Sequence, residues 1–463
     1  MKLRARGCLW QGILLALLLG GAGPAAAEER PIIEISPGKE RAFLVAVQVF
    51  RDDLMPPDPT RTGRLLESIE QGLDFNGVLL PLSREAFLGS QVTKELVSGP
   101  RYDCSDWTQS GANAVVEGVI SGANGELEVS YGVWDPARCV RLLRGQLMRS
   151  ASEMHGLGAA IADDIVKAFT GTRGAADTEI AFLSTRSGHR EVYVMDADGR
   201  SVRPATQGNS IKAFPGWLPN GEGILYTTYL KSGLPDIFLT SRGRSRAGRF
   251  LRDVLSRSPK YRGVFAPDGE ELALVASMGG ATELFRVQRN GRNLLRLTDN
   301  QDVIDVAPTW SPDGQQIAFV SDRSGTPQIY VMDRNGRNQR RITYQSSYSA
   351  APAWSPDGRW IAYGARTENQ FDLYLIDPTG DVNVPLVVHR RNDQSPSWSP
   401  DGRKVIFSSD RRGRSDLYVI DVNSYRLQRL TKDAKDNLSP SWGPFPGGPS
   451  ARVGPRSGPT GGE

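Results

Sequence analysis

An aromatic residue followed by a Pro-Asp-Gly turn recurs through the C-terminal part of the chain and constrains its fold more than any other feature. The clearest copy is Trp310-Ser-Pro-Asp-Gly314. The copies begin at Trp217, Phe265, Trp310, Trp354, Trp398 and, in degraded form, Trp442. Successive aromatic residues lie 48, 45, 44, 44 and 44 positions apart. A repeat of this period is typical of solenoids and propellers.

Each repeat contains four short stretches with strand character. The aromatic residue ends the first, and Pro, Asp and Gly have the backbone preferences of a tight turn. A hairpin follows, such as Ile317–Val320 with Ile329–Asp333, and a fourth strand passes through Arg341-Ile342-Thr343. Four strands in about 44 residues indicate one blade of a β-propeller.

The two ends of the repeat region predict how the ring closes. The first hairpin, Ile180–Leu183 with Val192–Asp196, has no aromatic strand before it, and the last aromatic strand, Leu438–Trp442, has no hairpin after it. Pairing these segments completes a sixth blade and removes open sheet edges. An open solenoid would need capping repeats, and none is visible. We therefore predict a six-bladed propeller over residues 173–445, closed by a C-terminal strand.

Residues 28–172 lack the repeat and mix helical with strand patterns. Phe43–Phe50 has strand character, and Arg61–Leu73 and Ala151–Phe169 have the spacing of amphipathic helices. Further strands are expected over 115–120, 127–134 and 139–147. These patterns predict an N-terminal α/β (α+β) domain.

The first 27 residues have the order of a secretory signal peptide. Lys2, Arg4 and Arg6 precede the apolar run Ile13–Leu19, and small residues lead to Ala27. The run is shorter than the roughly 20 residues that a membrane span needs, and no other stretch qualifies. Cleavage near Ala27 and export are therefore predicted, without a direct membrane span.

Charge and cysteine content narrow the function classes. The formal net charge is +4, and three of the cations belong to the predicted signal peptide, so the mature chain is nearly neutral. It has no overall field to attract nucleic acid. Export favours oxidised thiols, and for Cys104 and Cys139 a disulfide and two free thiols both remain open. The Pro/Gly-rich residues 446–463 predict a disordered tail.

No catalytic or metal-binding motif was found. The sequence lacks G-x-S-x-G, H-E-x-x-H and C-x-x-C patterns. His155, His189 and His389 fall in different repeats or domains, where we expect structural or surface roles. Asp196-Ala-Asp-Gly199 resembles a calcium-loop fragment, but its spacing favours a turn at a strand end. We predict a non-enzymatic protein with no metal and no cofactor.

Two surfaces are candidates for binding another protein. The basic stretch from Arg242 to Arg262 is either a solvated loop between blades or a patch for an acidic partner. Residues near the starts of the aromatic strands are expected at one mouth of the central channel, and their mixed polarity suits a protein-binding face. This predicted face comprises Lys212, Arg262, Asp302, Asp305, Tyr348, Ser349, Asp393 and Gln394.

The signal peptide, the domain of about 145 residues and the Trp-Ser-Pro-Asp-Gly repeats, in this order, resemble the TolB family of the Tol-Pal system. The resemblance implies a periplasmic, non-enzymatic, monomeric scaffold. It implies binding of the lipoprotein Pal, and of other outer-membrane proteins, through one propeller face. It also implies a mature N-terminus that is released to TolA, and a role in outer-membrane constriction during cell division and in envelope integrity. That N-terminus would be Glu28, Glu29, Arg30, Pro31, Ile32, Ile33, Glu34, Ile35 and Ser36.

This chain departs from the family pattern in one repeat, where Phe265 replaces Trp and the basic stretch precedes it. Two other functions stay open on the sequence. One is an accessory or gating propeller of a peptidase whose catalytic residues lie on a separate chain. The other is a carbohydrate-binding propeller, which would use some of the nine Trp.

Overall fold

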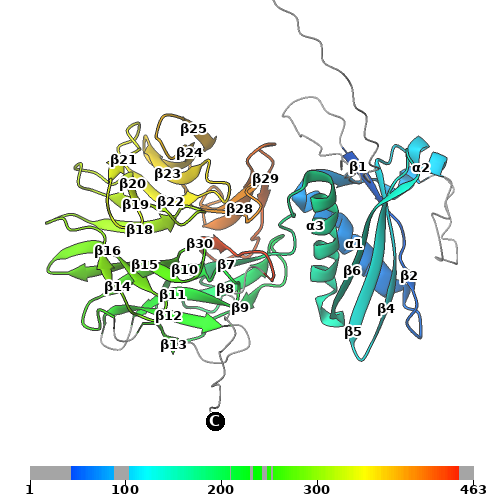
Figure 1. The fold of residues 1–463 in the computed structure, drawn as a ribbon, viewed down its shortest axis with the longest axis horizontal. Helices are drawn as coiled ribbons and strands as arrows, with labels where there is room; N and C mark the ends of the chain where they lie inside the picture. Colours follow the sequence, from blue (N-terminus) through cyan, green and yellow to red (C-terminus); the bar gives the residue numbers. More distant parts are fainter. Residues whose placement is uncertain are drawn as a thin grey trace, which may run out of the picture.

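A computed structural model describes residues 43–87, 104–208, 210–229, 233–241, 248–251 and 254–447. An α/β domain is followed by a ring of six four-stranded sheets (Figure 1). The predicted signal peptide, the segment 28–36 and nearly all of the predicted tail lie outside the described residues, as does part of the basic stretch. Within the described part, no helix is long and apolar enough to cross a membrane.

The N-terminal domain is built on one mixed sheet with the strand order β3-β1-β4-β5-β6, and β2 pairs with β4. β1 runs parallel to β3 and β4, whereas β4, β5 and β6 are antiparallel. The strands are β1 (Phe43–Val47), β2 (Arg51–Asp52), β3 (Leu79–Pro81), β4 (Ala114–Ala123), β5 (Glu126–Asp135) and β6 (Val140–Ser150). The helices are α1 (Pro59–Asn76), α2 (Cys104–Gln109), α3 (Met154–Thr170) and the short 3-10 turns η1 (Arg84–Ala86) and η2 (Ala151–Glu153).

Helices α1 and α3 pack together on one face of this sheet (Figure 1). Asp58 caps α1 by accepting from Thr60 N at 2.9 Å, and Gly77 ends it with φ 73°. The predicted apolar stripe of α1, which includes Leu65, Ile69 and Leu73, is buried. The predicted helix at Ala151 begins three residues late, because 151–153 form the turn η2.

A disulfide joins Cys104 to Cys139 with a Cα–Cα distance of 5.7 Å. It ties the short helix α2, which lies on the other face of the sheet with Trp107 buried against Trp134, to the turn before β6. Of the two alternatives that the sequence left open, the structure has the bridged one.

Each propeller blade is a four-stranded antiparallel sheet. Blade 1 contains β30 (Asn437–Trp442), β7 (Glu179–Ser184), β8 (Glu191–Asp196) and β9 (Arg203–Pro204). Blade 2 contains β10 (Lys212–Trp217), β11 (Gly223–Tyr229), β12 (Pro235–Ser241) and β13 (Gly248–Arg249). Blade 3 contains β14 (Lys260–Phe265), β15 (Glu271–Met278), β16 (Ala281–Gln288) and β17 (Leu295–Arg296).

The other three blades follow the same order. Blade 4 contains β18 (Asp305–Trp310), β19 (Gln316–Ser321), β20 (Gln328–Asp333) and β21 (Arg340–Arg341). Blade 5 contains β22 (Ser349–Trp354), β23 (Ile361–Thr367), β24 (Gln370–Ile376) and β25 (Asn383–Val387). Blade 6 contains β26 (Asp393–Trp398), β27 (Lys404–Ser409), β28 (Asp416–Asp421) and β29 (Leu427–Arg429). The first strand of each blade is the aromatic strand, called here the inner strand.

The predicted closure of the ring is confirmed. β30 pairs antiparallel with β7, with Leu438 opposite Leu183 and Trp442 opposite Ile180. Blade 1 is therefore made from both ends of the repeat region, and the fold is a six-bladed propeller preceded by an α/β domain.

The repeated turn is held by its own side chains. Ser399 Oγ accepts from the backbone N–H of Lys404 at 2.9 Å and also contacts the carboxylate of Asp401. Gly402, with φ 71°, supplies the left-handed backbone that the turn needs. These local requirements explain why the Ser-Pro-Asp-Gly sequence recurs.

Trp310 and Trp398 join neighbouring blades, whereas the indole of Trp354 donates within its own turn, to Gly358 O at 3.2 Å. The indole Nε1 of Trp310 donates to Val264 O at 3.0 Å, and that of Trp398 donates to Ala353 O at 2.9 Å. Each bond reaches the inner strand of the preceding blade. Because both rings are buried and their N–H groups are engaged, they are not free to stack on sugar rings.

Candidate functional site

The two ends of the propeller channel differ in what lies next to them. The carboxyl ends of the inner strands point toward the N-terminal domain, since Trp442 packs against Phe75 of α1 with ring centroids 6.3 Å apart. Lys404 Nζ donates to Asn76 O at 2.9 Å across the same joint. The amino ends of the inner strands therefore lie at the opposite end of the ring, which is called here the distal face.

The channel is lined by the inner strands and is rich in proline. A cavity of about 340 Å³ lies between them. Its walls include Pro215, Pro308, Pro352, Pro396 and Pro440. In blade 3 the equivalent residue is Gly263, and that blade places Arg262 on the channel wall.

Four residues of the predicted face are buried and do not belong to an exposed surface. They are the first residues of their inner strands, namely Lys212, Asp305, Ser349 and Asp393. Asp305 lies under Arg323 and Asp393 lies under Arg411, contacts that the inner-strand sequence alone does not reveal. The assignment of these four side chains to an accessible binding face is therefore wrong.

One of the four, Lys212, instead connects two blades. Lys212 Nζ lies 3.3 Å from Glu191 Oε1 of blade 1 and donates to Ser210 O at 2.8 Å. Lys260, which the sequence analysis did not select, is the equivalent residue of blade 3 and lies 3.2 Å from Asp236 of blade 2. Each cation is nearly inaccessible and is matched by a buried carboxylate, so these pairs are structural.

An arginine that recurs in three blades holds the start of the inner strand. Arg411 donates from Nε to Ser409 Oγ at 2.9 Å and from a terminal nitrogen to Asp393 at 2.9 Å. Its guanidinium also lies 4.5 Å from the ring centre of Tyr418. Arg323 makes the equivalent contacts with Ser321 and Asp305 in blade 4.

The signal for this cluster was present in the sequence. Ser-x-Arg follows the second strand of three blades, at Ser184-Thr-Arg186, Ser321-Asp-Arg323 and Ser409-Asp-Arg411. Its partner lies 18 residues upstream in two of them, at Asp305 and Asp393. That spacing could have marked these carboxylates as structural.

The other members of the predicted face are accessible. Asp302 and Gln394 are exposed, and Tyr348 is 36% exposed and meets Phe371 edge to face at 5.4 Å. Arg262 lies inside the channel, 5.9 Å from the ring centre of Phe214. The structure thus separates the eight predicted residues into four that are buried, three that are exposed, and Arg262, which is half-buried in the channel.

Arg262 has no hydrogen bond or ion pair with any described residue. Burial lowers the pKa of its guanidinium to about 10. At the third position of the inner strand, where blade 3 has Arg262, the other blades have Phe214, Ala307, Ala351, Ser395 and Ser439. One uncompensated cation therefore faces a channel with otherwise neutral residues at this level.

Large apolar side chains are exposed at the distal face, and the repeat pattern does not predict their exposure. Tyr344 is 68% exposed and Val388 is 64% exposed, and both precede inner strands. The set comprises Ile211, Tyr229, Leu234, Met278, Ile304, Tyr344, Tyr348 and Val388. Each lies in a loop before an inner strand or at the hairpin between the second and third strands. Exposed apolar groups gathered around a polar mouth are typical of protein-binding surfaces.

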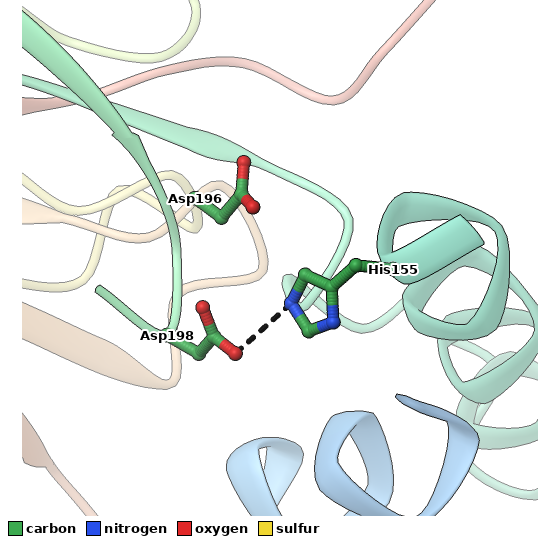
Figure 2. Close-up of side chains that lie close together, drawn as sticks. All are labelled: His155, Asp196 and Asp198. Carbon is green, nitrogen blue, oxygen red and sulfur yellow. Dashed lines mark ion pairs between the residues drawn. The ribbon is translucent and has the colours of Figure 1, made fainter. Parts of the chain in front are cut away.

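The histidines do not form a catalytic arrangement. His155 lies on α3, His189 in the β7–β8 loop and His389 after β25. Among the described residues, one group of side chains has the geometry to hold a metal ion, and it consists of His155, Asp196 and Asp198 at the joint between the domains (Figure 2). The predicted turn at Asp196 is present, with Gly199 N donating to Asp196 O at 2.9 Å.

Comparison with known proteins identifies the family. Residues 166–446 match the model of the TolB beta propeller domain, and residues 31–141 match that of the TolB amino-terminal domain. The chain belongs to the TolB family. Two similar proteins are both described as Tol-Pal system protein TolB. That of Anaeromyxobacter dehalogenans strain 2CP-C is 34% identical over 302 residues, which cover 65% of this chain and 67% of the relative. That of Desulfotalea psychrophila is 29% identical over 293 residues, which cover 62% and 63%.

A solved structure shares the whole architecture. The crystal structure of TolB from Acinetobacter baumannii superposes with a TM-score of 0.71 at 23% identity, covering 89% of this chain and 99% of that one. The resemblance to the TolB family inferred from the sequence is thus confirmed, as is the fold. Family membership places the chain in the Tol-Pal system as a periplasmic scaffold. It favours the non-enzymatic prediction over a peptidase accessory.

Proposed function

We propose that the distal face of the propeller binds Pal, and that the mature N-terminus, residues 28–36, carries the signal to TolA. In this proposal the protein is a monomeric adaptor that supports outer-membrane constriction during division and envelope integrity. The observation that carries the Pal contact is the exposed apolar rim around a channel that holds an unpaired Arg262.

The chemistry of the rim suits a protein partner. Tyr344 is held by a hydrogen bond from its hydroxyl to Arg341 O at 3.1 Å, and the Arg341 guanidinium lies 4.6 Å from its ring centre. Tyr348 is held against Phe371. Exposed tyrosines that are ordered before binding lose little conformational entropy when a partner covers them, which favours their use as anchors.

The channel adds an electrostatic requirement. Arg262 lies on a wall otherwise built largely of proline, aromatic and small residues. A partner that places a carboxylate at the mouth would supply its missing counter-charge. An acidic side chain of Pal in the centre of the interface, surrounded by apolar contacts to the rim, is the arrangement that we propose.

The test is the affinity of the purified protein for the soluble domain of Pal. Tyr344→Ala combined with Tyr348→Ala should weaken binding at least tenfold, since each removes an exposed aromatic anchor. Tyr425→Ala is the matched control, because Tyr425 is 61% exposed but lies in the turn before β29, away from the distal face. Equal affinity of the double variant and the wild type would refute this choice of face.

The N-terminal part of the proposal needs a separate experiment. Deletion of residues 28–36 should abolish capture by the soluble part of TolA while retaining capture by Pal. Retained TolA binding by the deletion variant would show that the signal is carried elsewhere.

A further inference from the structure

Three side chains meet where the N-terminal domain joins blade 1. His155 comes from the first turn of α3, and Asp196 and Asp198 come from the end of β8 and the turn after it (Figure 2). Their potential ligand atoms all lie within 4.8 Å of one another. His155 Nε2 is 3.0 Å from Asp198 Oδ2. The group therefore combines two domains and three donors of the kind that bind metal ions.

Ser68 fixes the orientation of the His155 imidazole by contacting the ring at Nδ1, the nitrogen that faces away from the carboxylates. Ser68 Oγ donates its one proton to His155 O at 2.7 Å and lies 3.0 Å from His155 Nδ1. Since that hydroxyl proton is already used, the contact with Nδ1 requires Nδ1–H to donate to the serine oxygen. Nε2 is then the nitrogen turned toward the carboxylates. A hydrogen bond of this kind behind the ring is typical of histidines that ligate metals.

We propose that His155 Nε2 and the carboxylates of Asp196 and Asp198 form a binding site for a divalent cation of the zinc type. One imidazole nitrogen and two carboxylate oxygens are a ligand set that Zn²⁺ accepts, with water in the fourth position. Ca²⁺ prefers a larger set made of oxygen atoms alone. The donor types therefore select zinc over calcium.

The three ligand atoms have to adjust their spacing slightly to coordinate an ion. Zn–N and Zn–O distances of about 2.0–2.2 Å in a tetrahedron separate neighbouring ligand atoms by about 3.4 Å. His155 Nε2 and Asp198 Oδ2, at 3.0 Å, are slightly closer than this spacing. The Asp196 carboxylate, whose ligand atom lies within 4.8 Å of both, would reach it by rotation of its side chain. No hydrogen bond or ion pair in the described part of the chain holds the Asp196 carboxylate, so it is free to make this movement.

The surrounding charges permit a cation. The two carboxylates would neutralise a divalent ion. The neighbouring Asp177 is already paired, with Arg149 at 2.5 Å and Arg173 at 3.3 Å. Arg200 Nε lies 3.4 Å from Asp198 Oδ2, but its side chain is 52% exposed and can turn into solvent. His155 and Asp196 also line a cavity of about 510 Å³, which gives the ion a route to the site.

Occupation of this site would link α3 directly to the β8–β9 turn. The cation would then fix the orientation of the N-terminal domain relative to blade 1. This inference rests only on the contacts between the N-terminal domain and blade 1. It does not depend on which partner the distal face binds.

The experiment is titration of the tag-free, chelator-treated full chain with Zn²⁺ by calorimetry. We expect one saturable site per chain in the wild type. His155→Gln and Asp196→Ala should each weaken it at least tenfold. The matched control His189→Gln should leave it unchanged, because His189 is exposed in a loop of blade 1. Saturation with Zn²⁺ should raise the melting temperature of the wild type but not of His155→Gln.

Co²⁺ provides a second readout that does not depend on stability. Its visible absorption spectrum should show tetrahedral coordination in the wild type, and Asp196→Ala should lose that signature while its circular dichroism remains native. Absence of saturable binding, equal affinity in the wild type and both site variants, or binding of Ca²⁺ in preference to Zn²⁺ would each overturn the proposal. In the first two cases the contact between His155 and Asp198 is an ordinary ion pair.

Discussion

Trp442, the last residue of β30, lies opposite Ile180 of β7, and its indole donates to Thr178 Oγ1 at 2.8 Å. One aromatic residue thus connects the C-terminal strand to the segment that enters the propeller. It also packs against Phe75 of the N-terminal domain. The same side chain therefore contributes both to closure of the ring and to attachment of the N-terminal domain.

Trp442→Ala should be strongly destabilising. The side chain is 6% exposed, so truncation removes a large buried surface and leaves a cavity, at a cost of about 3–5 kcal/mol. Urea denaturation of the wild type and the variant measures this cost. Tyr425→Ala, at an exposed aromatic residue, is the comparison and should change stability by less than about 0.5 kcal/mol. Similar midpoints for all three proteins would contradict the closure role.

Arg411→Ala should lower stability by about 3 kcal/mol, because it leaves the buried carboxylate of Asp393 without its cation. The adjacent Arg412 is exposed and provides a matched control in the same loop. Arg412→Ala is expected to melt like the wild type. Equal melting temperatures of the two variants would show that the Ser-x-Arg cluster contributes little.

Loss of the disulfide should destabilise the N-terminal domain. The bridge spans a sequence separation of 35 residues, for which the loop-entropy model gives about 3–4 kcal/mol. The double substitution Cys104→Ala and Cys139→Ala should therefore unfold at lower urea concentration. Mass spectrometry of the exported wild type with an alkylating agent should show no modification before reduction. Two alkylated thiols without reductant would contradict the bridge.

Asp421 should contribute stability that depends on pH. Burial alone would raise the pKa of Asp421, but attraction to Lys404 and hydrogen bonds to its carboxylate outweigh burial and hold that pKa below its ordinary value. A depressed pKa gives a contribution that is complete well above the unfolded value of about 3.9 and is lost as pH falls through the folded value.

Asp421→Asn should therefore be less stable than the wild type at pH 7, by about 1–3 kcal/mol. The difference should shrink as pH falls below about 3.9. Urea denaturation over this pH range measures both free energies of unfolding. A difference that stays constant with pH would exclude titration of Asp421 as its origin.

Arg262→Gln should separate binding from folding. Since the guanidinium has no hydrogen bond or ion pair with the described residues, its removal should leave the melting temperature unchanged or slightly higher. Affinity for the soluble domain of Pal should fall about tenfold or more, and Arg262→Lys should recover part of it. Calorimetric titration measures the affinity. Unchanged affinity in Arg262→Gln would remove the electrostatic part of the proposed interface.

The architecture could be predicted because its signals are local and repeated. Each blade encodes its own turn, so the spacing from Trp310 to Trp354 and Trp398 marks equivalent positions without knowledge of the tertiary structure. The unpaired segments at Ile180 and Trp442 then leave one way to close the ring. Strand content, blade number and closure follow from residues that interact within a blade or with the next one.

The accessible site could not be predicted in the same way, because burial is not a local property. Asp305 and Asp302 are three positions apart and are the same residue type, yet the first is inaccessible under Arg323 and the second is exposed. Loop lengths before the inner strands also vary, so the repeat spacing points to Arg262 and not to Lys260, the structural cation of the same blade.

The sequence by itself determined the ring, since turn geometry and strand periodicity are properties of short segments. Only the tertiary structure decided which charged residues became blade connectors, which apolar residues remained at the distal face, and that His155 meets Asp196 and Asp198. Those outcomes depend on how distant segments pack. The free energy of burying a charge or exposing an apolar side chain is set by neighbours that are far away in the chain.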